Sequence, residues 1–212
     1  MPMKLSEKGN ARRGFFEKAQ LDTLLAVLPA PLDDMARFGF ATGWRRGELL
    51  GLTWEAVSRE EVRLGTTKNG EPRSVPLDSE LAAIIERRRK AREFTTAAGV
   101  GLSAFVFHRN GKPINKTVFG KQWRAACQKV KLSGKLFHDL RRTAAWNMIR
   151  AGVPQSVAQR ITGHETDSMF RRYDITENRD ELAALEAARR YVDAEPEEKS
   201  NVVEMRSGLS SE

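Results

Sequence analysis

The residues best suited to chemistry lie between His138 and Tyr173. This stretch holds two of the three histidines, His138 and His164, and one of the two tyrosines. His138 and Arg141 are three residues apart, so on a helix they share one face. Imidazole and guanidinium groups beside a phenol could hold a phosphodiester while the Tyr173 oxygen attacks its phosphorus.

Arg45 fits the same chemistry. The segment Ala41-Thr-Gly-Trp-Arg45-Arg46-Gly-Glu48 places it where a loop is expected to lead into a helix. A guanidinium presents several donors in a rigid fork that suits two oxygens of one phosphate. The backbone N–H groups at a helix start also attract an anion. An Arg-Arg pair alone is more typical of an exposed helix start, so this interpretation depends on the other motifs.

Lys68 is a candidate proton donor. It lies in the segment Thr67-Lys68-Asn-Gly-Glu-Pro-Arg73-Ser-Val-Pro-Leu77, where Lys-Asn-Gly forms the expected turn between strand candidates at 62–64 and 74–77. An ammonium group can protonate a leaving oxygen if a cation-rich site of low dielectric lowers its pKa. For the tripeptide alone, a solvated hairpin lysine is the simpler interpretation.

A mostly helical framework is expected to position these residues. Apolar residues recur at helical spacing, and Pro29, Pro31 and Gly43 mark the ends of elements. The helices predicted in this way cover residues 17–28, 31–40, 46–52, 80–92, 116–130, 139–151, 154–161 and 178–191. His164 and Tyr173 are nine residues apart, which would put them on opposite faces of one straight helix. A bend or a separate segment must therefore come between them.

The composition is that of an ordinary globular protein. The chain has 212 residues, of which 40% are hydrophobic and 30% charged, enough to bury a sizeable core. No apolar run approaches the roughly 20 residues needed to cross a bilayer. The first residues lack the apolar stretch of a secretory signal, and the single cysteine cannot form an internal disulfide. These features favour a cytoplasmic protein without a membrane partner.

The charge distribution favours a polyanionic partner. The last 20 residues hold two basic and six acidic side chains, so residues 1–192 carry 34 basic against 22 acidic residues. Such an excess is typical of nucleic-acid binding, although a generic basic protein can also show it. The sequence has no Cys/His cluster, no carboxylate set for two metal ions and no Gly-rich loop for nucleotide phosphates. Metal-dependent nuclease and ATP-driven mechanisms are therefore disfavoured, and no cofactor is expected.

Taken together, the motifs resemble those of the tyrosine recombinases, the phage integrase family. The resemblance covers about residues 15–190 and follows the family order of boxes. The first box is Thr-Gly-x-Arg-x-x-Glu-Leu, the second Thr-Lys-x-Gly-x-x-Arg-x-Val-Pro-Leu, and the third contains His-x-x-Arg, Gly-His and a later tyrosine. The matched positions are Arg45, Lys68, His138, Arg141, His164 and Tyr173.

The sequence departs from the family pattern at two places. Arg142-Thr143 stands where His-Thr is commoner, and Thr162 replaces the leucine that usually precedes Gly-His. These changes leave the six matched positions untouched, so the expectations from the resemblance stand.

The resemblance implies an α+β, mostly α-helical catalytic-domain fold with a small antiparallel sheet near residues 57–77. It also implies cutting and rejoining of double-stranded DNA through a 3′-phosphotyrosyl intermediate, without metal or ATP. Tyr173 would be the nucleophile and Lys68 the acid for the leaving 5′ oxygen. Arg45, Arg141 and His164 would hold the phosphoryl oxygens, and His138 would accept a proton or orient a donor.

The resemblance further implies assembly. Four copies would act on two DNA sites, with weak association or a monomer in the absence of DNA. A C-terminal segment would dock on a neighbour, and residues 179–191 and Val202–Val203 are candidates for it. The expected organisation is a linker or arm at 1–14, a catalytic domain at 15–191 and a flexible tail at 192–212.

Two other functions remain open from the sequence alone. The chain reaches its first box within 45 residues, so the N-terminal DNA-clamping domain of longer relatives is expected to be missing. A DNA-binding fragment or decayed integrase remnant without recombination activity is therefore one alternative. A topoisomerase-like enzyme that relaxes supercoils through the same chemistry is the other.

Overall fold

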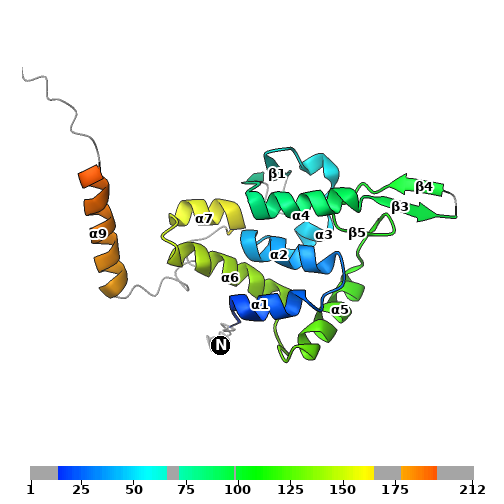
Figure 1. The fold of residues 1–212 in the computed structure, drawn as a ribbon, viewed down its shortest axis with the longest axis horizontal. Helices are drawn as coiled ribbons and strands as arrows, with labels where there is room; N and C mark the ends of the chain where they lie inside the picture. The colour runs from blue at the N-terminus through cyan, green and yellow to red at the C-terminus, as the bar shows by residue number, and fades with distance from the viewer. Residues whose placement is uncertain (1–13, 66–71, 98, 165–177, 195–212) are drawn as a thin grey trace, which may run out of the picture. The chain divides into compact units, whose positions relative to one another are not determined.

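The computed structural model describes residues 14–65, 72–97, 99–164 and 178–194. The chain divides into two compact units, Met1–Tyr173 and Asp174–Glu212. The described part of the first unit is helical with short strand pairs (Figure 1). Its helices are α1 (Lys18–Leu25), α2 (Leu32–Thr42), α3 (Arg46–Leu50), α4 (Ser79–Lys90), α5 (Lys116–Lys129), α6 (Phe137–Arg150) and α7 (Gln155–Thr162). Its strands are β1 (Glu61–Leu64), β2 (Arg73–Pro76), β3 (Glu93–Thr96), β4 (Gly99–Leu102), β5 (His108–Arg109) and β6 (Lys112–Pro113).

The core is built around α2 and α6, which pack against each other. Phe38 of α2 and Leu140 of α6 are fully buried. Aromatic rings join α5 to the start of α6: the Phe119 ring stacks on Trp123 at 6.0 Å between centroids and meets Phe137 edge-on at 5.3 Å. Aromatic pairs of this geometry add to the free energy of apolar burial. The core therefore fixes α6, the helix that carries His138 and Arg141, against α2.

Glycine ends the two helices that lead into the candidate site. Gly43 follows α2 with φ +70°, and Gly163 follows α7 with φ +72°. Both residues adopt the left-handed conformation in which glycine avoids a steric penalty. A Cβ on Gly43 would lie 2.9 Å from the Thr162 side chain, so the two turns also touch. Helix α7 ends before His164, and the segment between His164 and Tyr173, for which a bend or a separate segment is predicted, lies outside the described residues.

Helix α6 begins earlier than the predicted residue 139, at Phe137. The Asp139 carboxylate accepts a hydrogen bond from the Leu136 backbone N–H at 2.7 Å and is 1% exposed. A carboxylate in the first turn also interacts favourably with the helix dipole. This arrangement gives Asp139 a role in starting the helix and places His138 within the first turn.

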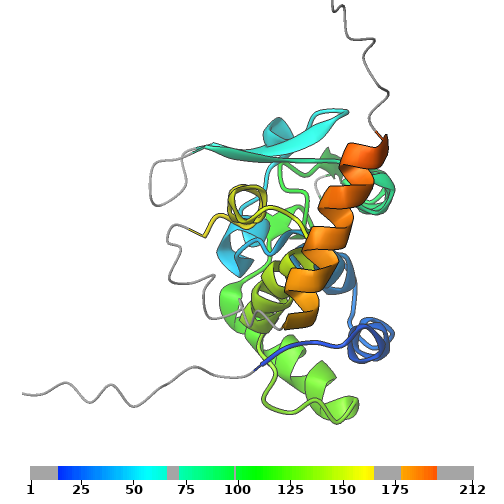
Figure 2. The same cartoon turned by 90° about the vertical axis from the view of Figure 1, so that its left-hand side faces the viewer.

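Strands β1 and β2 form the antiparallel pair expected near the middle of the chain. The register pairs Val62 with Val75 and Leu64 with Arg73, and both valines are buried. Helix α7 packs against β2, and Figure 2 shows this strand pair passing over α7 viewed nearly end-on. The hairpin therefore reaches the segment that ends in Gly163 and His164.

Two further strand pairs, β3–β4 and β5–β6, were not predicted. Thr95, Val100 and Leu102 are exposed, so these strands lack the alternation of buried and exposed residues that marks a strand in a sequence. Phe94 instead packs its ring over glycine: a Cβ on Gly111 would lie 2.4 Å from it. Packing of a ring against glycine requires no apolar side chain on the other strand, so the sequence shows no alternating hydrophobic pattern there.

Two predicted helices extend too far at their C-terminal ends. Helix α1 ends at Leu25 instead of residue 28, and α3 ends at Leu50 instead of residue 52. After α1 the chain tightens into a turn in which the Val27 N–H bonds to the Leu24 carbonyl. Leu28 remains 7% exposed, so apolar burial continues past the end of the helix.

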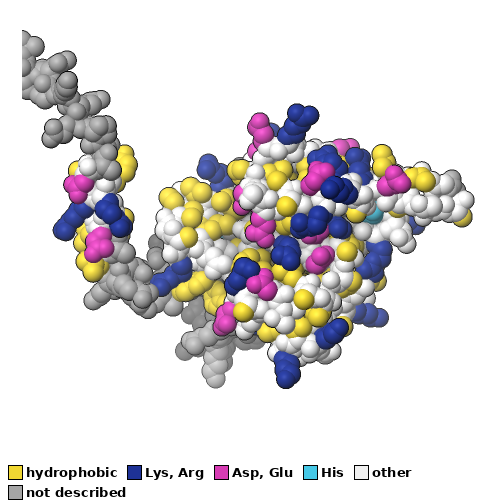
Figure 3. All heavy atoms as spheres, viewed as in Figure 1, with side chains coloured by type: hydrophobic (Ala, Val, Ile, Leu, Met, Phe, Trp, Pro, Cys, Tyr) yellow, Lys and Arg dark blue, Asp and Glu magenta, His cyan; other side chains and the backbone are white. Residues whose placement is uncertain are grey.

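Buried ion pairs link α4 to α2. The Asp34 carboxylate is 1% exposed and lies 2.6 Å from Arg87 Nη2 and 2.8 Å from Arg88 Nε. On the face shown in Figure 3, basic and acidic side chains are interspersed over the region of α4. The positive charges of α4 are therefore matched by nearby acids on this face.

The described part of the second unit is one helix, α9 (Asn178–Ala194). Its apolar side chains Leu182, Leu185, Tyr191 and Val192 are each more than half exposed. Within the described residues of both units, no helix combines the length and apolar character that a membrane span requires.

Truncating Leu140 is expected to destabilise the fold that supports the candidate site. Leu140 is fully buried between the site residues of α6, so Leu140→Ala removes apolar contacts and leaves a cavity. We expect the free energy of unfolding to fall by about 3 kcal/mol, measured by urea titration. Leu185→Ala on the exposed face of α9 is the control. An equal loss in both variants would contradict the assignment of the core.

Candidate active site

Arg45 occupies the turn between α2 and α3. It is the residue immediately before α3, where its backbone N–H donates to Glu48 Oε2 at 2.6 Å. Its side chain donates from Nη1 to Glu48 Oε1 at 3.1 Å and from Nη2 to the Gly163 carbonyl at 3.4 Å. The first turn of α3 thus presents a guanidinium that its own helix holds in place, as the loop-to-helix position predicted.

Arg141 projects from α6 into a pocket of backbone carbonyls. The residue is 2% exposed. Its Nη1 donates to the carbonyl oxygens of Gly43, at 2.8 Å, and of Thr162, and its Nη2 donates to the Gly163 carbonyl at 2.9 Å. A buried cation needs such partners to offset its loss of hydration. Arg141 therefore links the turn after α2 to the turn after α7.

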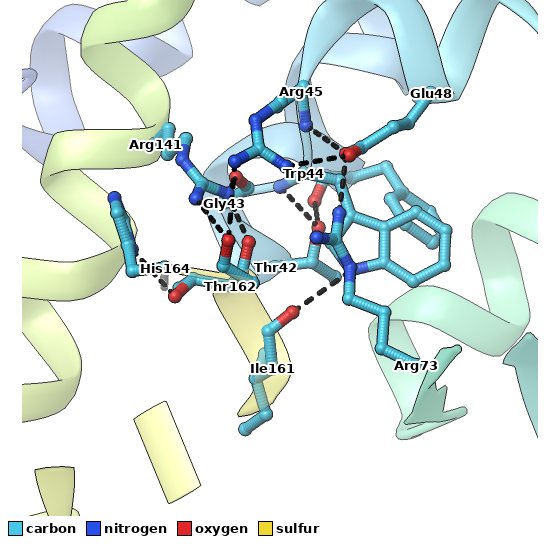
Figure 4. Close-up of polar contacts among 12 residues, drawn as sticks. Thr42, Gly43, Trp44, Arg45, Glu48, Arg73, Arg141, Ile161, Thr162 and His164 are labelled. Atoms are coloured by element: carbon cyan, nitrogen blue, oxygen red, sulfur yellow. Dashed lines mark hydrogen bonds and ion pairs between the residues drawn. The ribbon is translucent and has the colours of Figure 1, made fainter. Parts of the chain in front are cut away.

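The two guanidinium groups converge on one atom. Both Arg45 Nη2 and Arg141 Nη2 donate to the Gly163 carbonyl oxygen. Figure 4 shows the Arg45 and Arg141 side chains next to each other. Two guanidinium groups that donate to one carbonyl oxygen can also donate to the oxygens of one phosphoryl group placed beside it.

His164 follows Gly163 and is 6% exposed. Its Nδ1 lies 2.8 Å from the Thr162 hydroxyl, which is itself 2.7 Å from the Ala158 carbonyl. A carbonyl only accepts, so the hydroxyl donates there and its oxygen accepts from Nδ1–H of His164. Burial, followed by the charges of Arg141 and Arg45, lowers the pKa of His164 to about 3. In the unbound protein the ring is therefore neutral, with a lone pair on Nε2.

His138 lies one turn before Arg141 on α6. It lines a cavity of about 450 Å³ together with Trp44 and Arg46. The aromatic residues Phe119, Trp123 and Phe137 line the same cavity. Partial burial of the ring, and then the charges of Arg141 and Arg142, lower the pKa of His138, although the residue as a whole is exposed. A neutral imidazole at the edge of the site can accept a proton.

Arg73 lies behind Arg45. Its Nη2 pairs with Glu48 Oε2, and its guanidinium carbon is 5.3 Å from the centroid of the Trp44 ring. The Trp44 indole N–H donates to the Ile161 carbonyl at 3.1 Å. Glu48 thus receives hydrogen bonds from two arginines, and Trp44 ties the turn after α2 to the last turn of α7 (Figure 4).

The structure brings four of the six candidate residues together. Arg45, Arg141 and His164 meet around Gly163, and His138 is close enough for its charge to lower the pKa of His164. The other two candidates, Lys68 and Tyr173, lie outside the described residues.

Sequence reasoning assigned no role to Arg73, Trp44 or Thr162. Arg73 stood within the motif that contains Lys68, and Thr162 was noted as a departure from the family pattern. The Thr162 hydroxyl contacts His164 and accepts its hydrogen bond, which a leucine at this position could not do. Trp44 carried no signal beyond its position beside Arg45.

Other chemistry finds little support among the described residues. No group of three or more His, Cys, Asp or Glu side chains in that part of the chain is placed to bind a metal ion. Cys127 is 1% exposed, and burial raises the pKa of its thiol to about 11. A thiol of that pKa is a poor nucleophile near neutral pH.

The low pKa of His164 predicts acid sensitivity. The unfolded chain binds a proton at His164 below about pH 6.5, whereas the folded protein binds it only near pH 3. Stability is therefore complete above pH 6.5 and falls as the pH drops between these values, by about 2 kcal/mol at pH 5 from this residue. Urea unfolding at pH 7 and pH 5 measures the loss. It should be smaller in His164→Asn, and an identical pH dependence in both proteins would refute the prediction.

Comparison with known proteins places these features in context. The model of the phage integrase family matches residues 15–179. The shufflon-specific DNA recombinase of Escherichia coli is 32% identical over 154 residues, which is 70% of this chain and 36% of that protein. The integrase of Salmonella phage P22 is 24% identical over 177 residues, 81% of this chain and 46% of that protein. The chain thus spans less than half the length of these curated relatives.

Solved structures share the fold. The Tn1549 transposon integrase in complex with circular intermediate DNA superimposes with a TM-score of 0.65 at 20% identity, over 84% of this chain and 66% of that chain. A lambda integrase dimer bound to a COC′ core site gives a TM-score of 0.63 at 18% identity, over 78% of this chain and 49% of that chain. These matches establish the mostly helical α+β catalytic-domain fold expected from the sequence.

Proposed function

Because the chain belongs to the phage integrase family, we propose that it is the catalytic domain of a tyrosine-type site-specific DNA recombinase. The observation that carries the proposal is the convergence of Arg45 and Arg141 on the Gly163 carbonyl, directly before His164. Three separate segments of the chain supply these groups. Such an arrangement holds cationic donors around one point, which is the main requirement of phosphoryl-transfer catalysis.

The proposed reaction is a transesterification. The Tyr173 oxygen attacks phosphorus, the bond from phosphorus to the 5′ oxygen breaks, and a 3′-phosphotyrosyl bond forms. His138 accepts the phenol proton and Lys68 gives a proton to the departing 5′ oxygen. In the second step a 5′ hydroxyl of another strand attacks the phosphotyrosine and releases Tyr173. The bond count is unchanged throughout, so no energy source is required.

The arginines and His164 hold the negative charge of the phosphoryl group. In the unbound protein His164 is neutral, with its Nδ1–H on Thr162. A bound phosphodiester brings negative charge close to the ring, which raises the His164 pKa. The resulting imidazolium donates from Nε2 to a non-bridging oxygen, while Thr162 keeps the ring orientation. This assignment combines the family role of His164 with its neutral state in the free protein.

The proposed partner is double-stranded DNA, and the proposed assembly on it is a homo-tetramer. The basic excess of residues 1–192 supports the first part. The DNA-bound Tn1549 and lambda integrases with the same fold support it further. We place the catalytic domain at residues 15–191, between an N-terminal arm at 1–14 and a C-terminal tail at 192–212; residues 1–13 and 195–212 lie outside the described residues. The tail and residues 179–191 are the candidate contact with a neighbouring copy.

A covalent trap tests the proposal. A pool of nicked duplexes with randomised sequence releases a short strand after cleavage, so the protein stays linked to the DNA. We expect a denaturation-resistant adduct in the presence of EDTA and without ATP, with the DNA attached to Tyr173 by peptide mapping. Folded protein that binds the pool but forms no adduct would instead support a DNA-binding remnant. Relaxation of plasmids that lack a selected site would point to topoisomerase-like activity.

A further inference from the structure

Arg73 is buried at the back of the candidate active site. It lies on β2, and its side chain is 7% exposed. Its Nη2 pairs with Glu48 Oε2, the same oxygen that accepts the Arg45 backbone N–H at 2.6 Å. Glu48 Oε1 accepts from Arg45 Nη1 at 3.1 Å. The Glu48 carboxylate is therefore held between two guanidinium groups, so the position of Arg73 helps to determine the direction in which Arg45 points.

Arg73 also contacts the segment that carries His164. A Cβ built on Gly163 would lie 1.7 Å from Arg73 Nη1, so the guanidinium packs directly on the Gly163 backbone. The carbonyl of that glycine is the shared acceptor of Arg45 and Arg141. Arg73 thus touches both halves of the site, one through Glu48 and one through the backbone of Gly163.

Fold stability alone gives little reason for an arginine here. Burial lowers the pKa of Arg73, and its Nε has no hydrogen-bond partner among the described residues. Replacing a buried ion pair by apolar groups is often neutral for stability or even favourable. A methionine could cover the Trp44 ring and fill the space beside Gly163. A charged and incompletely paired side chain at this position is better explained by what it orients.

We propose that Arg73 is a positioning residue that fixes the direction of the Arg45 fork through Glu48 and the placement of Gly163 and His164 by packing. This inference rests on the proposed function, because the orientation of these groups matters when they hold a phosphate. It also ties β2 to the site. One side chain of that strand thus contacts Glu48, which holds Arg45, and the backbone of Gly163.

The first test compares Arg73→Met with Arg63→Met. Arg63 lies on the neighbouring strand β1 and is exposed, so it is a matched control from the same hairpin. With wild-type protein that forms the adduct, Arg73→Met should lower the single-turnover rate of adduct formation by about 10²-fold at saturating protein, since misplacement by about 1 Å has effects of that size. The dissociation constant for DNA should change less than about threefold, and Arg63→Met should leave the rate unchanged. A wild-type rate in folded Arg73→Met would overturn the proposal.

A neutral substrate separates positioning from general support of the fold. A methylphosphonate at the scissile position lacks one negative oxygen, so its cleavage depends less on a well-aimed Arg45. If Arg73 acts through Arg45, Arg73→Met should lower the rate of adduct formation on this substrate by only about threefold or less relative to wild type. An equal defect on both substrates would mean that Arg73 only supports the fold and would overturn the proposal. If Arg73→Met does not fold, the two substrates can be compared in Arg73→Lys instead. Lysine keeps the positive charge but lacks the planar guanidinium group.

A spectroscopic test needs no activity. In ¹⁵N spectra the Arg45 guanidinium, assigned through Arg45→Lys, should give separate Nη signals because Glu48 hinders its rotation. These signals should merge in Arg73→Met and remain separate in Arg63→Met. If they remain separate in both variants, Arg73 does not position Arg45. If they merge as expected and wild-type protein forms no adduct, the proposed function fails while the positioning role stands.

Discussion

Replacing Tyr173 by phenylalanine is expected to abolish the covalent protein–DNA adduct. Phenylalanine keeps the ring but lacks the oxygen that forms the bond to phosphorus, so no other atom of that side chain can replace it. We expect the adduct rate to fall by on the order of 10⁴-fold or more. Denaturing gel electrophoresis of the trapped suicide substrate measures it. DNA binding, which depends on the basic side chains, should be retained.

Tyr191→Phe is the control, because this tyrosine is 68% exposed on α9 and is the only other one in the chain. It should form the adduct at the wild-type rate. An adduct that survives in Tyr173→Phe and disappears in Tyr191→Phe would move the nucleophile to α9. An adduct that survives in both would mean that another residue type attacks the phosphate.

Replacing Arg141 is expected to affect both the reaction and the fold. In Arg141→Met the phosphate loses a cationic donor, and the rate of adduct formation should fall by about 10³-fold. The carbonyls of Gly43 and Thr162 also lose the guanidinium that they share. Buried carbonyls left without a donor each cost about 1–3 kcal/mol. We therefore expect the free energy of unfolding to drop by about 3 kcal/mol, measured by urea titration together with the adduct rate.

Two further variants separate these effects. Arg150→Met, at the exposed C-terminal end of the same helix, should leave both quantities close to wild type. Arg141→Lys keeps the positive charge, but a single ammonium group cannot donate to three carbonyls as the guanidinium does. We therefore expect it to restore little of the adduct rate or of the free energy of unfolding. Full activity in Arg141→Lys would show that only the charge matters, and unchanged stability in Arg141→Met would contradict the structural role of the guanidinium.

Most helices were predictable because their apolar residues repeat with the helical period and their ends carry recognisable residues. The helix predicted over residues 80–92, for example, begins at Ser79, directly after Asp78, whose side chain accepts the Leu81 backbone N–H at 2.8 Å. The β3–β4 pair was missed because it is exposed and packs on glycine, which leaves no apolar alternation. The local signals are strong where burial repeats regularly and absent where packing depends on small residues.

The candidate site was only partly predictable for a related reason. Arg45, His138, Arg141 and His164 could be named because they stand in sequence motifs that resemble those of a known family. The acceptors that hold the arginines are mainly backbone carbonyls, and any residue type supplies one. Arg73 acts from a strand 28 residues after Arg45, with Glu48 between them. Such a contact depends on how α3 and β2 pack, which the spacing of residues along the chain does not specify.

The Gly163 carbonyl has an evolutionary consequence. Since this oxygen belongs to the backbone, mutation cannot delete it, and a substitution affects it only by changing the local conformation. Selection at this position therefore acts on backbone shape, through the left-handed φ of Gly163 and the space that Arg73 occupies. Related domains could therefore change much of the surrounding surface during evolution. The two guanidinium groups would keep their common acceptor, provided that the turn after α7 keeps its glycine.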